Sequence, residues 1–161
     1  MMIGRREFLK TGLAGSVMLG LAGCAGISDD QETAMLTAIS AALLAGALTE
    51  DADARETALA ETVRGVRHAI AGLSINAQKE VAELFSLLTL APARRFVAGV
   101  SSPWHEASGE DVAAFLESWR FSRFALLQSA YAALHDLVFG AWYARPENWP
   151  AIGYPGSPEV F

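Results

Sequence analysis

The amino-acid sequence predicts an all-α fold, a small antiparallel bundle of about five helices over residues 24–145 with an extended tail over residues 146–161. Alanine and leucine dominate residues 30–145, without the apolar/polar alternation that half-buried strands show. The Asn-Gly and Asp-Gly pairs that favour tight β-hairpins are absent from the sequence. Apolar residues instead recur at helical spacing in several segments, which indicates amphipathic helices facing one core.

The first helix is expected behind the acidic pair Asp29 and Asp30, because acidic side chains favour the N-terminus of a helix. Its apolar positions are Met35, Leu36, Ile39 and Leu43. The second helix is expected near Asp53, which together with Glu56 resembles a capping box at its start. Its apolar stripe, spaced four and three residues apart in turn, consists of Leu59, Val63, Val66, Ile70 and Leu73.

A third helical segment follows Ser74, Ile75 and Asn76 and is interrupted at Pro92. Residues 93–100 are expected to form a short separate helix, followed by a loop over residues 101–105. Ser108 with Asp111 predicts the start of a fourth helix, and a long fifth helix comes after it. The apolar positions of the three long segments are Val81, Leu84, Phe85 and Leu88; Val112, Phe115, Leu116 and Trp119; and Phe124, Leu127, Tyr131, Leu134, Val138 and Trp142.

Residues 1–23 are expected to be a signal peptide rather than part of the fold. A pattern that resembles a twin-arginine (Tat) export signal, ahead of an uncharged Gly/Ala/Leu run, is carried by Arg5, Arg6, Phe8, Leu9 and Lys10. The following Leu-Ala-Gly-Cys ending resembles a bacterial lipobox, in which Cys24 is acylated and becomes the new N-terminus. The alternative is an uncleaved membrane helix, but the uncharged run from Thr11 to Ser28 holds five glycines and barely reaches the length of a span.

The composition of the chain after cleavage restricts its partners. Removing residues 1–23 takes away three bases and one acid, which leaves nine Lys and Arg against seventeen Asp and Glu. This acidic balance argues against nucleic acid as a partner, and against attachment to anionic lipid by charge. Acyl chains on Cys24 are therefore expected to hold the protein at the membrane. Because Cys24 is the only cysteine, the mature fold has no disulfide, no CxxCH haem site and no cysteine metal cluster.

No residue of the sequence is predicted to be catalytic, cofactor-binding or metal-ligating. Helical bundles often hold di-iron sites on Glu-x-x-His, but none of His68, His105 and His135 has a glutamate three residues before it. The sequence shows no glycine-rich loop behind a strand and no nucleophile elbow. An enzymatic role of this chain itself is therefore not expected.

Two segments are candidates for binding a partner protein. In the first, Trp119, Arg120 and Arg123 stand among aromatic residues of an acidic chain, and Arg and Trp are frequent interface hot spots. The alternative, favoured slightly, is that Trp119 and Phe121 fill the core while the arginines face solvent. The second segment is the tail, which holds four of the six prolines and is expected to run extended along a surface, its own or a partner's. Its candidate residues are Trp149, Ile152, Gly153, Tyr154, Pro155 and Gly156.

Several of these segments resemble one known family. Besides the twin-arginine leader, the resemblance is carried by Leu43 to Leu48, Gln78-Lys79-Glu80 leading to Leu84-Phe85, Leu116 to Arg123, Ala141-Trp142-Tyr143 and the tail from Trp149 to Pro155. Together they resemble the gluconate 2-dehydrogenase subunit 3 type, the small, twin-arginine-exported subunit of membrane-associated flavin-dependent dehydrogenases. The resemblance covers nearly the whole chain, and the Trp-x-x-Ile-Gly-Tyr-Pro-Gly end is its most specific part.

The resemblance implies a non-catalytic role in a complex. In such complexes a large flavoprotein of the glucose-methanol-choline (GMC) type carries FAD and oxidises an alcohol or sugar, and a c-type cytochrome often takes the electrons. The small subunit binds the folded flavoprotein, which lacks an export signal, and its own leader carries the pair through the Tat translocase. Lipidation of Cys24 departs from members whose leaders are simply removed, and implies a periplasmic, lipid-anchored subunit. In a Gram-negative host, Ala25 after Cys24 favours the outer membrane. The alternative is a free-standing helical envelope lipoprotein with a structural or ligand-binding role.

Overall fold

The computed structural model describes residues 28–156, and it confirms the predicted fold class. The described residues form six α-helices and one 3₁₀ helix, with no strand among them. The helices are α2 (Asp29–Leu43), α3 (Ala52–Ala71), α4 (Ile75–Thr89), α5 (Ala91–Phe96), α6 (Gly109–Arg120), α7 (Ala125–Tyr143) and the 3₁₀ helix η1 (Pro146–Ile152).

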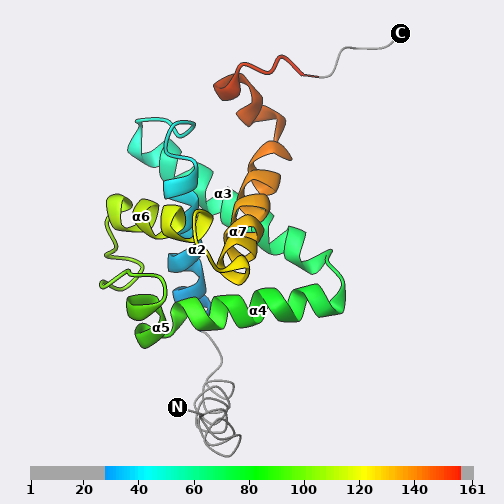
Figure 1. The fold of residues 1–161 in the computed structure, drawn as a ribbon. Coiled ribbons are helices and arrows are strands. Elements are labelled where there is room, and N and C mark those ends of the chain that lie inside the picture. Colours follow the sequence, from blue (N-terminus) through cyan, green and yellow to red (C-terminus); the bar gives the residue numbers. More distant parts are fainter. Residues whose placement is uncertain (1–27, 157–161) are drawn as a thin grey trace, which may run out of the picture.

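The helices surround one core, with α7 packed most extensively on α3 and α2 packed against α6, α3 and α4. Figure 1 shows α2 and α7 upright, while α4 lies across the lower end of the bundle and α6 crosses α2. The N-terminal end of α2 lies at the lower end, on the side of α4 and α5, and η1 projects from the upper end. The two ends of the described chain therefore leave the bundle on opposite sides.

Side-chain caps fix where four of the helices begin. Ser28, Asp51, Ser74 and Ser108 keep extended backbone conformations, and each accepts a hydrogen bond from the backbone N–H three residues later. The predicted start at Ser108 is confirmed, with 3.1 Å between its Oγ and the backbone N of Asp111. The predicted capping box at Asp53 is wrong, because Asp51 is the residue that stays extended and Asp53 already lies in the first helical turn.

The short helix was expected over residues 93–100, but α5 spans Ala91–Phe96. Proline lacks an N–H and has a fixed φ, which suits the first positions of a helix, so Pro92 lies at the start of α5 rather than before it. The helix ends early because Gly99 takes a φ of 77°, a left-handed conformation that favours glycine.

The core contains most of the apolar positions that helical spacing predicts. The largest fully buried side chains are Trp119, Met35, Leu36, Ile39, Leu44, Leu88 and Leu134. The exceptions lie at helix ends, where the periodicity stops: Leu73 follows α3 and Phe124 precedes α7, and both are exposed. Among the described residues, no helix is long and apolar enough to cross a membrane.

The tail was expected to be extended, and this is wrong for its first half, because Pro146–Ile152 forms the 3₁₀ helix η1. Pro146 occupies its first turn, where the missing N–H is not needed. Gly153 then ends η1 with a φ of 72°. A proline-rich segment can thus form a 3₁₀ helix, because a helix this short has few backbone hydrogen bonds and needs few N–H donors.

The contact between α3 and α7 depends on a glycine. A Cβ added at Gly65 would lie 2.9 Å from the Cβ of Ala141, which is closer than real Cβ atoms approach. The same addition at Gly140, on α7, would meet no atom within 4 Å. The two helical glycines therefore suit a comparison, because an added methyl group would clash at Gly65 and would meet no other atom at Gly140.

We expect Gly65→Ala to destabilise the protein by about 1 kcal/mol, because overpacking outweighs the gain in helix propensity. Gly140→Ala should stabilise it by about 0.5–1 kcal/mol, since only the propensity gain remains. Urea unfolding followed by circular dichroism measures both changes. Equal stabilisation by the two alanines would mean that α3 and α7 do not meet at Gly65.

Candidate partner-binding surfaces

The proline-rich tail is built onto the end of α7 by side-chain hydrogen bonds. The Asn148 amide donates to the Trp142 carbonyl oxygen and the Trp149 indole N–H donates to the Tyr143 carbonyl oxygen, both over 2.9 Å. Both carbonyls belong to the last turn of α7, where few backbone donors are within reach. The Trp142 carbonyl also accepts from the backbone N–H of Arg145 over 3.3 Å, and the Asn148 amide adds a second hydrogen bond to it. Asn148 is buried, so its bond also satisfies a polar group removed from water.

Beyond these bonds the tail folds back on itself. The Trp149 and Tyr154 rings pack edge to face with their centroids 5.2 Å apart. Gly156, with a φ of 98°, lies beside the Trp149 ring, since a Cβ added to it would be 3.6 Å from that ring. We call the residues that line the shallow hollow here, of about 270 Å³, the tail cluster: Pro146, Trp149, Pro150, Gly153, Tyr154 and Pro155. The side chain of Ile152 lies outside the part of the chain that the structure describes.

Arg145 ties the tail cluster to the bundle. Its guanidinium group forms ion pairs with Glu61 of α3 and with Glu147 of η1, the latter over 2.7 Å. The pKa of the Glu147 carboxylate lies below its ordinary value, because the carboxylate accepts hydrogen bonds from the backbone N–H of Glu147 and from the Arg145 side chain. The lowered pKa means that this contact is present at neutral pH and is lost when acidification protonates the carboxylate.

In the other candidate segment, Trp119 belongs to the core. Its side chain is 1% exposed, and its ring packs edge to face on Phe115 with the centroids 4.8 Å apart. The indole N–H donates over 3.1 Å to the carbonyl oxygen of Val97, just after α5. Trp119 therefore joins the ends of α5 and α6, and only its neighbours are free to contact a partner.

Phe121 was grouped with Trp119 as a core residue, and this is wrong, because its side chain is 70% exposed. Since α6 ends at Arg120, the chain turns at Phe121 and the helical periodicity no longer applies. The Arg120 guanidinium lies 5.2 Å from the centroid of the Phe121 ring, and that of Arg123 lies 4.8 Å from the Phe124 ring. Both arginines are exposed, as expected.

The structure does not bring the two candidate segments together. Residues 119–123 precede α7 and the tail cluster follows it, and a helix of 19 residues is about 28 Å long. Figure 1 shows η1 beyond the upper end of α7 and the turn from α6 into α7 at its lower end. The chain thus has two separate candidate surfaces, one at each end of α7.

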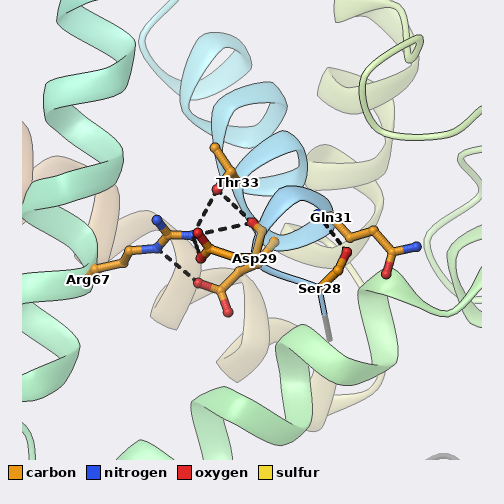
Figure 2. A network of polar contacts seen from close by, with 6 residues as sticks. Ser28, Asp29, Gln31, Thr33 and Arg67 are labelled. Atoms are coloured by element: carbon orange, nitrogen blue, oxygen red, sulfur yellow. Dashed lines mark hydrogen bonds and ion pairs between the residues drawn. The ribbon is translucent and has the colours of Figure 1, made fainter. Parts of the chain in front are cut away.

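A polar network that was not predicted from the sequence joins α2 to α3 (Figure 2). Arg67 of α3 donates from Nη2 to Asp29 Oδ1 over 2.7 Å and to Thr33 Oγ1 over 2.8 Å, and from Nε to Glu32 over 3.1 Å. Its partners are 34 to 38 residues away in the chain, so no local pattern could reveal them. Beside Arg67 lies an open, mostly apolar groove of about 550 Å³ between α2 and α3, with Arg55 and Arg64 along it.

His135 lies on α7 between the aromatic rings of Tyr131 and Phe139. His135 lies 3.1 Å from Asp136 and packs on the Phe139 ring, and no three or more metal-ligating side chains gather among the residues described. The leader and lipidation residues lie outside the described residues: Arg5, Arg6, Phe8, Leu9, Lys10 and Cys24.

No family model, curated protein or solved structure matches this chain.

Proposed function

We propose that this chain is the non-catalytic small subunit of a GMC-type, FAD-dependent alcohol or sugar dehydrogenase. In this role it binds the folded flavoprotein, carries it through the Tat pathway and holds it at the membrane. The observation that carries the proposal is the tail cluster. The segment with the most specific family resemblance forms a fixed, partly exposed aromatic surface at one end of the bundle.

The tail cluster has the properties of a docking element. Two hydrogen bonds to α7 and the Arg145 ion pairs hold it in one conformation, which lowers the entropy lost on binding. Trp149 is partly exposed and Tyr154 is 43% exposed, so both rings present apolar area that a partner would bury. Large aromatic side chains in such a position are frequent hot spots.

The leader supplies the other half of the proposal. The Tat pathway transports proteins that have already folded, which suits a flavoprotein that must acquire FAD in the cytoplasm. Acylation of Cys24 would then anchor the complex in the periplasm, because each buried methylene of an acyl chain contributes about 0.8 kcal/mol. A c-type cytochrome subunit is the expected electron acceptor of the flavoprotein.

Purification of the tagged chain from its native host tests this function. We expect a larger protein to co-purify and to bring the absorbance of roughly stoichiometric flavin. The matched control is the same purification from cells in which the gene of the co-purifying protein is deleted, where the flavin absorbance should disappear. A chain that purifies alone and colourless in gentle detergent would instead identify a free-standing helical lipoprotein.

A further inference from the structure

Much of the chain's positive charge lies near the end of α5 and in the turn from α6 into α7, away from the tail cluster. Four of the nine basic residues after residue 23 are Arg94, Arg95, Arg120 and Arg123. Residues 84–105 and 118–135, which contain them, have no aspartate or glutamate. None of the four arginines forms an ion pair with a described residue. No ion pair within the described residues therefore neutralises them, although the chain as a whole is acidic.

Large apolar side chains are exposed between these arginines. Phe96 is 83% exposed, Phe121 is 70% exposed and Phe124 is 56% exposed. The two segments lie side by side, because the hydrogen bond between Trp119 and Val97 holds the end of α5 against the end of α6. We call this region the Arg/Phe surface: Arg95, Phe96, Arg120, Phe121, Arg123 and Phe124.

We propose that the Arg/Phe surface binds the headgroup region of an anionic phospholipid bilayer. Each phenylalanine has an arginine next to it in the sequence, and two of the rings carry a guanidinium group 4.8–5.2 Å from their centroids. Such pairs suit a bilayer interface, where the ring enters the apolar boundary and the guanidinium remains at the level of the phosphates. Anionic headgroups attract basic residues near the surface.

The position of this surface in the fold supports a bilayer over a second protein as the occupant. In Figure 1 the N-terminal end of α2 and α5 lie at the lower end of the bundle, and the tail cluster lies at the upper end. Cys24 precedes Ser28 by four residues, which an extended chain can span over at most about 14 Å. An acyl anchor on Cys24 would thus hold the lower end close to the membrane. The tail cluster would point away from the membrane, free for a partner.

Site-specific fluorescence tests this proposal without depending on the flavoprotein. The full chain with Cys24→Ser has no other cysteine, so Phe121→Cys or Phe96→Cys places one environment-sensitive label on the Arg/Phe surface. We expect a blue shift and protection from iodide quenching on phosphatidylcholine vesicles that contain a quarter phosphatidylglycerol. Salt at about 0.5 M, which screens charges strongly, should reverse both changes.

The matched control is Tyr154→Cys in the same background, because it has the same leader but places the label on the tail cluster. Its emission should not change with vesicles. In the Phe121→Cys chain, Arg120→Gln with Arg123→Gln should raise the lipid concentration for half-maximal shift by about thirtyfold. The side chains substituted within the described residues are exposed, and unchanged helical circular dichroism verifies the fold of each variant.

Three results would overturn the proposal. In the first, the labels at 96 and 121 would stay in water on anionic vesicles. In the second, their emission would shift equally on pure phosphatidylcholine. In the third, they would be shielded only when the co-purifying protein is added, which would make the Arg/Phe surface a protein interface. A failure here leaves the proposed function intact, because that function rests on the tail cluster and is measured by flavin co-purification.

Discussion

Replacing Trp119 with alanine is expected to destabilise the protein by about 3–5 kcal/mol, the range for large aromatic truncations in a core. The Trp119 side chain is almost completely buried and packs edge to face on Phe115. Its indole N–H also satisfies the carbonyl of Val97, so the substitution leaves that carbonyl without its partner. Because this bond joins the ends of α5 and α6, α5 should lose protection from amide hydrogen exchange first.

Phe121→Ala is the matched control, two residues along the chain. Its side chain is largely in solvent, so the free energy of unfolding should change by no more than about 0.5 kcal/mol. Urea denaturation followed by circular dichroism measures both variants under the same conditions. A similar loss for both would contradict the division of this segment into a buried anchor and an exposed surface.

The second large effect is expected at the tail cluster. Trp149→Ala with Tyr154→Ala should weaken binding of the flavoprotein by about a thousandfold, because two hot-spot side chains of about 2 kcal/mol each are lost. Stability should fall by only about 1 kcal/mol, the usual worth of one hydrogen bond, here from Trp149 to Tyr143. The buried core residues, which precede residue 144, remain in place.

Two further variants make this measurement specific. Phe121→Ala with Phe124→Ala also removes two exposed aromatic rings, but at the other end of α7, and should leave flavoprotein affinity unchanged. Trp149→Phe keeps a ring but removes the N–H that bonds to Tyr143, so it tests how much the fixed conformation contributes. Unchanged flavoprotein binding together with a strongly lowered melting temperature would identify the tail cluster as an internal strap only.

The helices could be predicted from the sequence because their signals are local. Apolar spacing of three and four residues and the cap at Ser108 depend on neighbours within one or two turns. The tail could not be predicted in the same way. Proline content argued for an extended chain, whereas Asn148 and Trp149 bond to carbonyls of α7 six residues earlier and stabilise a 3₁₀ helix.

The candidate surfaces required the three-dimensional structure. Phe121 follows the end of α6 by one residue, so the same pattern that correctly buried Trp119 placed it wrongly in the core. The contact that brings α5 beside α6 joins Val97 and Trp119, which are 22 residues apart. Net charge is a sum over the whole chain and does not show where charges lie in the fold. The acidic composition therefore gave no sign that four arginines lie close to exposed phenylalanines.

If this chain exports a partner that has no signal of its own, the location of the flavoprotein in the cell depends on the leader of this chain. The measurement is the fraction of flavin-dependent dehydrogenase activity found in the cell envelope of the native host. With Arg5→Lys and Arg6→Lys, which replace the planar guanidinium pair by ammonium groups, we expect this activity to move to the cytoplasm together with the chain. The control substitution Glu7→Gln, beside the arginine pair, should leave it in the envelope. A flavoprotein that still reaches the envelope while this chain is retained in the cytoplasm would contradict the claim.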